Sequence, residues 1–219
     1  MSQRLTRQLD IIPVAVLGEP ITIIGAGAVG SWTAKALARM GFADIRVFDP
    51  DVVDMVNLNS QGYRLTDVGL PKVDALRIAI LEETGTRIEA VQAKYEGGKF
   101  RGVVIGAVDN MEARAKIWSE HLLAFGVTGI IDARMGAEQI IVQVIRPGDP
   151  SDRENYPKSL YSDAQAMHEP CTAKATIYTA YLISGLIVKA VKDLVTAGNY
   201  LKRTEWNVAK NDALMFKKK

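Results

Sequence analysis

The chain has 219 residues, of which 48% are hydrophobic and 24% charged, a balance typical of a globular protein that buries a core. Its 27 basic and 25 acidic side chains leave a net charge of +2, which is too small to favour nucleic acid as a partner. The single cysteine, Cys171, excludes a disulfide within one chain, and neither a signal peptide nor a membrane span is recognisable, so we expect a cytoplasmic protein with no membrane partner.

Apolar runs alternate with stretches of helical periodicity along most of the chain. Helices are predicted at Val29 to Met40, Lys72 to Glu83 and Met111 to Phe125, between strands at Ile21 to Ile24, Ile45 to Phe48, Arg87 to Gln92, Val103 to Val108 and Gly129 to Asp132. This β-α-β order predicts an α/β fold of the Rossmann-like, doubly wound class with a mostly parallel sheet. A strand at Gln139 to Ile145 follows after a short turn, which predicts antiparallel C-terminal strands.

The remaining segments complete one predicted domain over residues 1–219. Residues 1–17 form an N-terminal arm interrupted by Pro13, and the polar residues 147–170 form a crossover or lid loop without clear periodicity. A long helix is predicted from about Thr172 to Ala197, where Gly198 and Asn199 end it, and a last strand is predicted at Thr204 to Ala209.

A glycine turn with the pattern G-x-G-x-x-G follows the first strand, at Gly25, Gly27 and Gly30. Glycines at these positions allow a tight turn and a close approach to phosphate, while the N-terminus of the next helix offers unpaired N–H groups. The sequence therefore predicts a phosphate-bearing ligand. Asp49, at the end of the second strand, suits the ribose of NAD and of ATP equally.

The residues after Asp49 favour ATP over a dinucleotide. A hydrogen-bonding run of Asp51, Asn57, Asn59, Ser60 and Gln61 leads to Gly69-Leu70-Pro71-Lys72. Pro71 can begin the next helix, so Lys72 would lie in a first turn where the helix dipole disfavours a cation. A triphosphate facing the glycine turn explains that placement, and an ordinary surface lysine is the alternative.

Asp109 ends the fourth predicted strand, at the sheet edge where open α/β folds bind ligands. It is either the N-cap of the helix that begins near Met111 or, together with the glycine turn and Lys72, a ligand of Mg²⁺ beside the phosphates.

This ordered set of motifs resembles the nucleotide-binding domain of the ThiF/MoeB/HesA family, the bacterial relatives of ubiquitin-activating enzymes. The resemblance rests on the glycine turn, then D-x-D with N-L-N-x-Q, then G-x-P-K, then the strand-ending D-N, and it extends from Arg4 past Cys171. It implies binding of ATP with Mg²⁺ and adenylation of a carboxylate, commonly the C-terminal glycine of a small ubiquitin-like or sulfur-carrier protein.

The resemblance also implies a role for each matching residue. Asp49 would bind the ribose, Asn57 and Lys72 the phosphates, and Asp109 the metal. Arg7 and Gln8 resemble an element that reaches across a homodimer to the partner's phosphates. Mg²⁺ and these cations would stabilise the charge that develops as pyrophosphate leaves.

Two further positions bear on the family pattern. Ser60 stands where the family commonly has a phosphate-binding arginine, and Arg64 or Arg134 is a hypothetical substitute. Cys171 falls where some members carry a cysteine nucleophile; it would lie at or just before a helix start, which favours the thiolate, or else pack there as a small hydrophobe. The candidate catalytic residues are Asp109, Lys72, Arg7 and Cys171.

Two other functions remain open from the sequence. Ser60 is compatible with a non-catalytic nucleotide-binding scaffold in which the active site has decayed. The glycine turn with Asp49 is compatible with an NAD-dependent oxidoreductase, although no Tyr-x-x-x-Lys and no paired catalytic histidines stand where hydride chemistry would need them.

Overall fold

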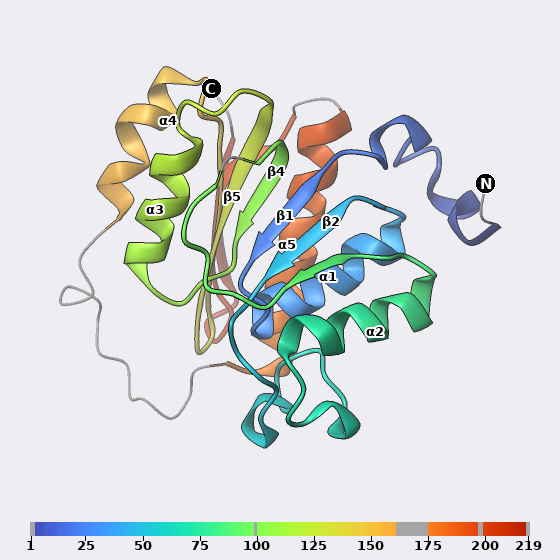
Figure 1. Ribbon diagram of the computed structural model, residues 1–219. Helices are drawn as coiled ribbons and strands as arrows, with labels where there is room; N and C mark the ends of the chain where they lie inside the picture. Colours follow the sequence, from blue (N-terminus) through green and yellow to red (C-terminus); the bar gives the residue numbers. More distant parts are fainter. Residues whose placement is uncertain (1–2, 99, 161–174, 197–198, 218–219) are drawn as a thin grey trace.

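The computed structural model describes residues 3–98, 100–160, 175–196 and 199–217. Its centre is an eight-stranded sheet with the order β3-β2-β1-β4-β5-β6-β7-β8 (Figure 1). The strands are β1 Ile21–Ile24, β2 Ile45–Phe48, β3 Glu89–Val91, β4 Gly102–Gly106, β5 Val127–Gly136, β6 Gln139–Ile145, β7 Leu201–Asn207 and β8 Asp212–Lys217.

The first five strands are parallel and the last three pairings are antiparallel, so the predicted fold class is confirmed. Every residue of β1 and β4 is buried. Strands covered on both faces need continuous apolar sequence, which explains why these two were found as uninterrupted hydrophobic runs.

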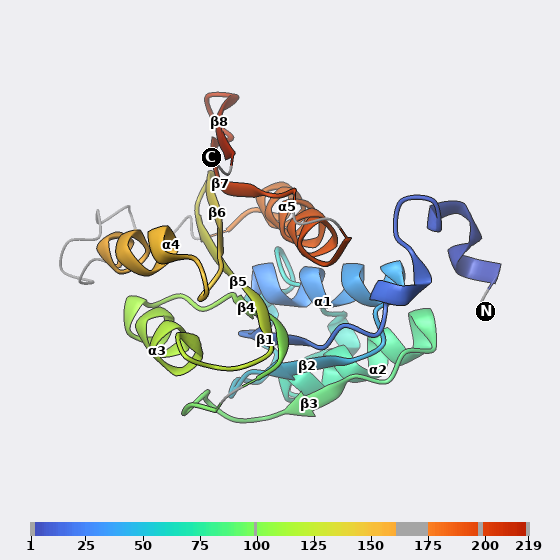
Figure 2. The ribbon, with the colours of Figure 1, turned by 90° about the horizontal axis from the view of Figure 1, so that it is seen from above.

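Helices cover both faces of the parallel half. Figure 2 shows α1, α2 and α5 on one face and α3 and α4 on the other. Their bounds are α1 Ala28–Met40, α2 Lys72–Thr84, α3 Met111–His121, α4 Pro150–Asn155 and α5 Ile177–Thr196. Helix α5 packs across α1 and β5, so the last helix of the chain closes the core over the first. Within the described residues, none of the helices has the length and apolar character needed to span a membrane.

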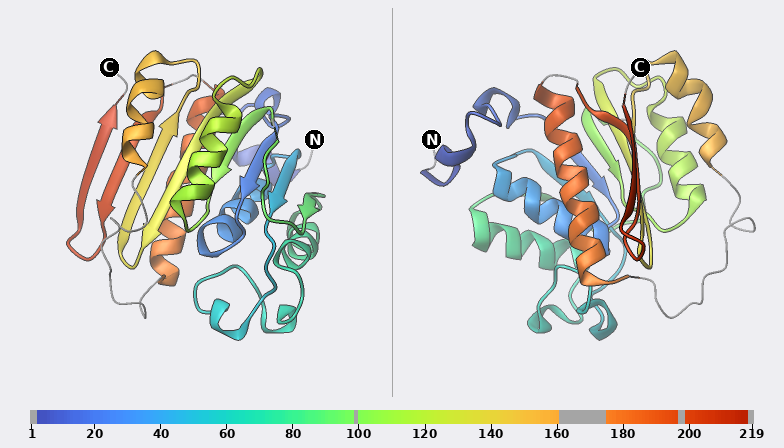
Figure 3. Two further views of the ribbon diagram at one scale, coloured as in Figure 1. Left: turned by 60° about the vertical axis from the view of Figure 1, so that its left-hand side comes forward. Right: turned by 180° about the vertical axis from the view of Figure 1, so that it is seen from behind.

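The C-terminal strands differ from the prediction. One strand was expected at Thr204 to Ala209, but β7 and β8 form a hairpin whose turn includes Asn211 at φ 54° (Figure 3). Every residue of β8 is exposed. Because neither face of β8 is buried, its sequence lacks the alternation that identifies a half-buried strand.

A crossover or lid loop was predicted at 147–170, but residues 147–160, the part that the structure describes, are largely helical. Residues 150–155 form α4 and Pro157–Ser159 form the 3₁₀ helix η5. The helix begins where Asp149 Oδ1 accepts a hydrogen bond from Ser151 N at 2.9 Å, with Pro150 at the first position, and this short capping signal was missed. Helix α5 begins at Ile177 rather than Thr172, and the candidate nucleophile Cys171 lies outside the described residues.

The N-terminal arm packs on the hydrophobic core of its own chain. It contains the 3₁₀ helices η1 Gln3–Gln8 and η2 Val14–Val16. Leu5, Ile12 and Leu17 are buried in the main hydrophobic cluster, and Arg4 Nη1 donates to the Ala38 carbonyl at 3.1 Å. These contacts attach the arm to the C-terminal end of α1.

Candidate functional site

The glycine turn lies at the point where the strand order reverses. Strands β2 and β3 extend to one side of β1, and β4 and β5 extend to the other. Ala107 N, just past β4, donates to Ile24 O at the end of β1 at 2.8 Å. Ligands of open α/β sheets bind in the crevice at such a switch point, at the carboxyl ends of the strands.

The three glycines of the turn have different surroundings. A Cβ atom at Gly25, which has φ +100°, would lie 2.4 Å from Ala107 O, and one at Gly30 would lie 1.8 Å from Gly25 O. A Cβ at Gly27 would have no other heavy atom within 4 Å. Gly25 and Gly30 are therefore required by close backbone packing, whereas Gly27 borders open space at the N-terminus of α1.

Asp49 fixes the shape of this turn. Its Oδ2 accepts a hydrogen bond from Ala26 N at 2.6 Å, and its Oδ1 accepts one from Asp51 N at 2.9 Å. Burial raises the pKa of Asp49, while these two N–H groups and the charge of Lys72 act in the opposite direction. The carboxylate thus joins the glycine turn to the segment that follows β2.

That segment, residues 50–71, projects beyond the carboxyl edge of the sheet, and we name it the lobe (Figure 1). Three hydrogen bonds attach it to the glycine turn and α1. Tyr63 Oη donates to Ala26 O at 2.6 Å, Gly62 N donates to Ser31 Oγ at 2.9 Å, and Trp32 Nε1 donates to Ser60 O at 2.9 Å.

Sequence reasoning missed Tyr63 and Trp32, which donate two of these hydrogen bonds. Burial, followed by the nearby carboxylate of Asp49, raises the pKa of Tyr63, so its hydroxyl remains a neutral donor. Ser60 is 5% exposed, and its backbone carbonyl accepts the Trp32 indole N–H. The position that lacks the family arginine is therefore a structural contact of the lobe.

Lys72 is buried at the start of α2 and faces the acidic end of β2. Its Nζ lies 2.8 Å from Asp51 Oδ2, and its N–H donates to Asp51 O at 2.9 Å. The side chain of Lys72 is 8% exposed, whereas that of Asp51 is 63% exposed. The cation is fixed by the protein, and its counterion can turn out toward water.

The other polar residues of the lobe are partly engaged within it. Asn57 Oδ1 accepts a hydrogen bond from Asp54 N at 2.9 Å in a capping box, and Asn59 is exposed. Gln61 Oε1 is buried and finds no hydrogen-bond partner among the described residues. A buried carbonyl oxygen without a donor indicates a position where water or a ligand is expected.

Asp109 follows β4 and is exposed at the same edge of the sheet. The N-cap of α3 is Asn110, whose Oδ1 accepts a hydrogen bond from Ala113 N at 2.8 Å. Asp109 instead accepts a hydrogen bond from the Asn110 side chain at 3.0 Å. Asp109 is therefore not the N-cap of α3, which was the alternative to a role in metal binding. Its side chain is exposed at the edge of the sheet that carries the glycine turn.

These residues lie within the segment, residues 17–211, that matches the family model described as ThiF family. The chain belongs to the ThiF family.

Curated relatives of this ThiF-family chain share part of its sequence. Ubiquitin-like modifier-activating enzyme 5 of Drosophila willistoni is 29% identical over 151 residues, which are 59% of this chain and 36% of the relative. The protein of the same name from Oryza sativa subsp. japonica is 32% identical over 114 residues, which are 43% of this chain and 27% of the relative. The chain spans about a third of the length of these relatives.

Solved structures resemble the ThiF-family chain over nearly all of its length. PaaA has a TM-score of 0.76 with 17% identity, covering 99% of this chain and 74% of PaaA. E. coli MccB, in a crystal structure with ATP, has a TM-score of 0.76 with 13% identity, covering 99% of this chain and 72% of MccB. At these identities the likeness establishes the fold.

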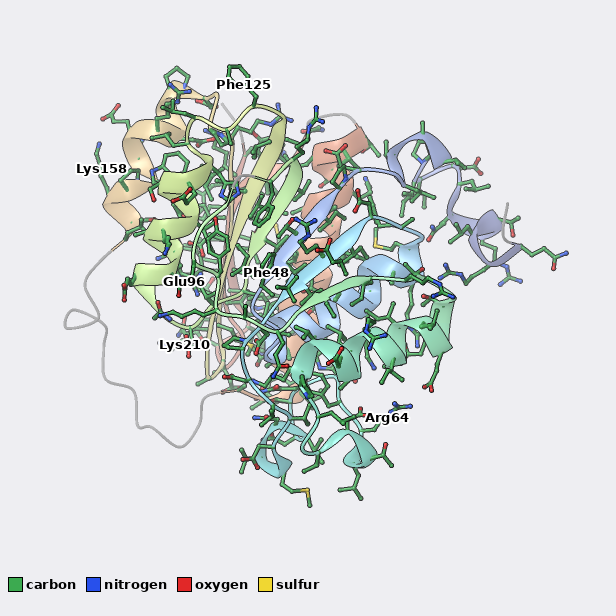
Figure 4. The ribbon with its side chains drawn as sticks, viewed as in Figure 1. Phe48, Arg64, Glu96, Phe125, Lys158 and Lys210 are labelled. Carbon is green, nitrogen blue, oxygen red and sulfur yellow. The ribbon has the colours of Figure 1, made fainter. Side chains whose placement is uncertain are left out.

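A buried ion cluster that the sequence did not reveal lies behind Asp109 in the ThiF-family chain. Asp132 in β5 contacts Arg114 from α3 and Arg134 from its own strand, and all three are buried. Arg134, a hypothetical replacement for the missing family arginine, also donates to Ser159 O at 2.9 Å. The other hypothetical replacement, Arg64, pairs with Asp67 and Glu82 at the outer side of the lobe (Figure 4).

The structure brings most of the candidate residues to one edge of the sheet. The switch point is surrounded by Gly25, Gly27, Gly30, Asp49, Asp51, Lys72 and Asp109, while Arg7 is exposed on the arm, which is attached at the opposite end of α1. Helix α1 has 13 residues, so it separates Arg7 from the glycine turn of the same chain by roughly 20 Å. Among the described residues, no cluster of three or more His, Cys, Asp or Glu side chains is placed to bind a metal.

Proposed function

We propose that this ThiF-family chain is an ATP- and Mg²⁺-dependent adenylyltransferase that activates a carboxylate, the C-terminal glycine of a small ubiquitin-like or sulfur-carrier protein. The observation that carries the proposal is the buried amine of Lys72, fixed near Asp49 beside a glycine turn whose middle glycine borders open space. A desolvated cation next to a phosphate-binding turn fits a triphosphate better than the pyrophosphate of a dinucleotide alone.

The residues of the site fit the nucleotide and its metal. Asp49 has a second lone pair on each oxygen for the ribose hydroxyls, and the amides of Asn57, Asn59 and Gln61 supply neutral donors at the lobe. Asp109 would hold Mg²⁺, which prefers one or two carboxylates together with phosphate oxygens and would neutralise charge on the departing pyrophosphate.

The chain contributes mainly by positioning the two reactants. An oxygen of the acceptor carboxylate attacks the α-phosphorus of ATP, and the bond between the α-phosphorus and the bridging oxygen breaks to release pyrophosphate. Lys72 stabilises the negative charge that moves onto the leaving group, and the glycine turn fixes the direction of attack. Such alignment of two bound groups contributes several kcal/mol, and no side chain is needed as a general acid or base.

A homodimer would complete the site with Arg7. The arm is anchored at the far end of α1, so Arg7 would have to act on a second copy of the chain. In a later step, as the resemblance to the family implies, the Cys171 thiolate would attack the carbonyl carbon of the acyl adenylate, forming a thioester and releasing AMP. The names of the curated relatives, ubiquitin-like modifier-activating enzymes, support an acceptor of the ubiquitin-like class.

The test is exchange of labelled pyrophosphate into ATP in the presence of Mg²⁺ and carrier proteins ending in Gly-Gly. We expect carrier-dependent exchange by the wild type and a loss of about 100-fold in Lys72→Ala and Asp109→Asn, the magnitude typical for removing one group that stabilises developing charge. Lys158→Ala is the matched control, because Lys158 forms an exposed ion pair with Glu154 on the outer side of the molecule (Figure 4).

Two other results would assign a different function. Binding of ATP with no exchange for any carrier would favour a nucleotide-binding scaffold, the reading that Ser60 supports because one cation is missing from the phosphate site. Binding of NADH in preference to ATP would favour an oxidoreductase. Either result would overturn the adenylyltransferase proposal.

A further inference from the structure

Asp132 is the centre of a buried cluster of charged groups on the β4–β5 side of the site. It is 2% exposed, and its register partner across the sheet is Gly106, the last residue of β4. Its Oδ1 contacts Arg114 Nη1, and its Oδ2 accepts hydrogen bonds from Arg134 at 2.7 to 2.8 Å. One carboxylate therefore serves two buried guanidinium groups.

Arg114 connects this carboxylate to the backbone that carries Asp109. Its Nη2 donates to the carbonyl of Val108, the residue before Asp109, and its Nη1 donates to Ala133 O at 3.0 Å. The planar guanidinium reaches both carbonyls and the carboxylate at once, a geometry that an amine cannot reproduce. The position of the Asp109 backbone is thus set from inside the protein.

Arg134 connects the same carboxylate to the segment after β6. Its guanidinium donates to Ser159 O at 2.9 Å and to Ser159 Oγ at 3.1 Å. Tyr156, one turn earlier, is 2% exposed, and burial, together with the charge of Asp132, raises its pKa. Tyr156 also packs against Trp118 of α3 at a ring distance of 5.2 Å.

The balance of charge explains why Asp132 matters to both connections. Removing one partner of a buried ion pair leaves an uncompensated charge, which is far more costly than the pair itself is stabilising. Without Asp132, two guanidinium groups would repel each other in the interior, and Arg114 would move away from the Val108 carbonyl.

We infer that Asp132 is a positioning residue, which acts through Arg114 to hold the backbone of the Asp109 loop where its carboxylate can bind Mg²⁺. The inference rests on the proposed function, because it takes Asp109 as the metal ligand. Groups that orient a metal ligand typically change metal affinity by about 10- to 100-fold when they are replaced.

The experiment measures ATP affinity of the full chain with Mg²⁺ and with EDTA. In Arg114→Lys, which keeps the buried charge but loses the planar fork, we expect affinity with Mg²⁺ to fall about tenfold. Affinity in EDTA should stay within about twofold of the wild type, because the glycine turn and Lys72 are untouched. Asp132→Asn should give the same pattern, with thermal unfolding reporting whether it folds.

Two further variants separate the steps of the inference. In Arg134→Lys, Mg²⁺ should raise ATP affinity as much as in the wild type, because Asp132 then still contacts Arg114. Lys116→Ala is the control on the same helix, since Lys116 pairs with Glu96 at the surface.

The outcomes distinguish this inference from the proposed function. If Mg²⁺ no longer raises the ATP affinity of Asp109→Asn but still raises that of Arg114→Lys as much as in the wild type, Asp132 and Arg114 do not position the metal ligand, and the proposed function stands. If Arg114→Lys lowers the affinity equally with Mg²⁺ and with EDTA, its role is structural only and the inference is overturned. If Mg²⁺ raises the ATP affinity of Asp109→Asn as much as that of the wild type, both the metal assignment and the inference fail.

Discussion

The two sides of the candidate site are stabilised by different physics. On the side of the glycine turn, close backbone contacts and hydrogen bonds to backbone groups fix the structure, as with Tyr63 on Ala26 O and Gly30 against Gly25 O. On the β4–β5 side, two guanidinium groups share the buried carboxylate of Asp132. Geometry therefore sets the first side, and charge balance sets the second.

This difference predicts how each side fails. A single added methyl group should disrupt the glycine side, where backbone atoms leave no space. On the β4–β5 side, the stability of the fold should tolerate a change of shape that keeps the charge, as in Arg114→Lys, better than a change of charge that keeps the shape, as in Asp132→Asn. The variants below test the first half of that contrast, beginning with the largest expected effect, and the thermal unfolding of Arg114→Lys and Asp132→Asn tests the second half.

Gly30→Ala should have the largest effect, because its Cβ would lie 1.8 Å from Gly25 O and neither backbone can move away without breaking the turn. We expect the free energy of unfolding to fall by about 3 kcal/mol or more, measured by urea denaturation. Gly148→Ala is the control, since a Cβ there would have no heavy atom within 4 Å. Equal stability of the two variants would show that the close contact is relaxed at little cost.

Gly27→Ala should separate folding from binding on the same turn. Its Cβ would enter open space, so the free energy of unfolding should change by less than about 0.5 kcal/mol. The methyl group would occupy the approach of the phosphates, and ATP affinity measured by calorimetry should fall about tenfold. Unchanged affinity would place the phosphates elsewhere.

Asp51→Asn should have opposite effects on stability and binding. Loss of the counterion of buried Lys72 should lower the free energy of unfolding by about 1 kcal/mol, a modest amount because Asp51 is 63% exposed. The freed amine should bind ATP about threefold more tightly, since no carboxylate competes with phosphate. Weaker binding would instead show that Asp51 contacts the nucleotide or its metal directly, as the sequence pattern implies.

Acidification should weaken the packing around His121, two turns along α3 from Arg114 of the charged cluster. His121 is fully buried; its Nε2 accepts a hydrogen bond from Phe100 N at 3.3 Å, and its Nδ1 lies 2.7 Å from Ile117 O as the donor. Burial lowers the pKa of His121 below its usual 6.5, so the unfolded chain binds the proton first. Stability is therefore complete above about pH 6.5 and should fall as the pH decreases through the lower native pKa.

Urea denaturation between pH 8 and pH 5 measures this effect, with His121→Gln as the matched variant. The pH dependence in this window should be smaller in the variant than in the wild type. The same slope in both proteins would assign the titration to other groups.

The fold could be predicted because its signals are local. Strands β1, β2 and β6 begin and end where the apolar runs do, and Gly25 to Gly30 form a pattern that is complete within six residues. The β8 hairpin and α4 were missed because their residues are exposed or the helix is short. Periodicity identifies an element only when one of its faces is buried.

The supports of the site could not be predicted, because they connect distant parts of the sequence. Tyr63 bonds to a carbonyl 37 residues earlier, and Arg114 contacts a carboxylate 18 residues later on another element. A tyrosine or arginine in such a position has the same composition and spacing as one on the surface. The sequence therefore indicated the candidate ligand-binding groups but not the residues that hold them in place.

Trp32 gives the site an optical signal of its own. Its indole N–H bonds to Ser60 of the lobe and its ring meets the edge of Tyr181 on α5 at 4.7 Å, while the other two of the three tryptophans, Trp118 and Trp206, lie on α3 and β7. Any displacement of the lobe changes the polarity and quenching around this one indole. The emission of the unlabelled protein can thus report, in real time, whether a ligand rearranges the lobe or enters a rigid, preformed crevice.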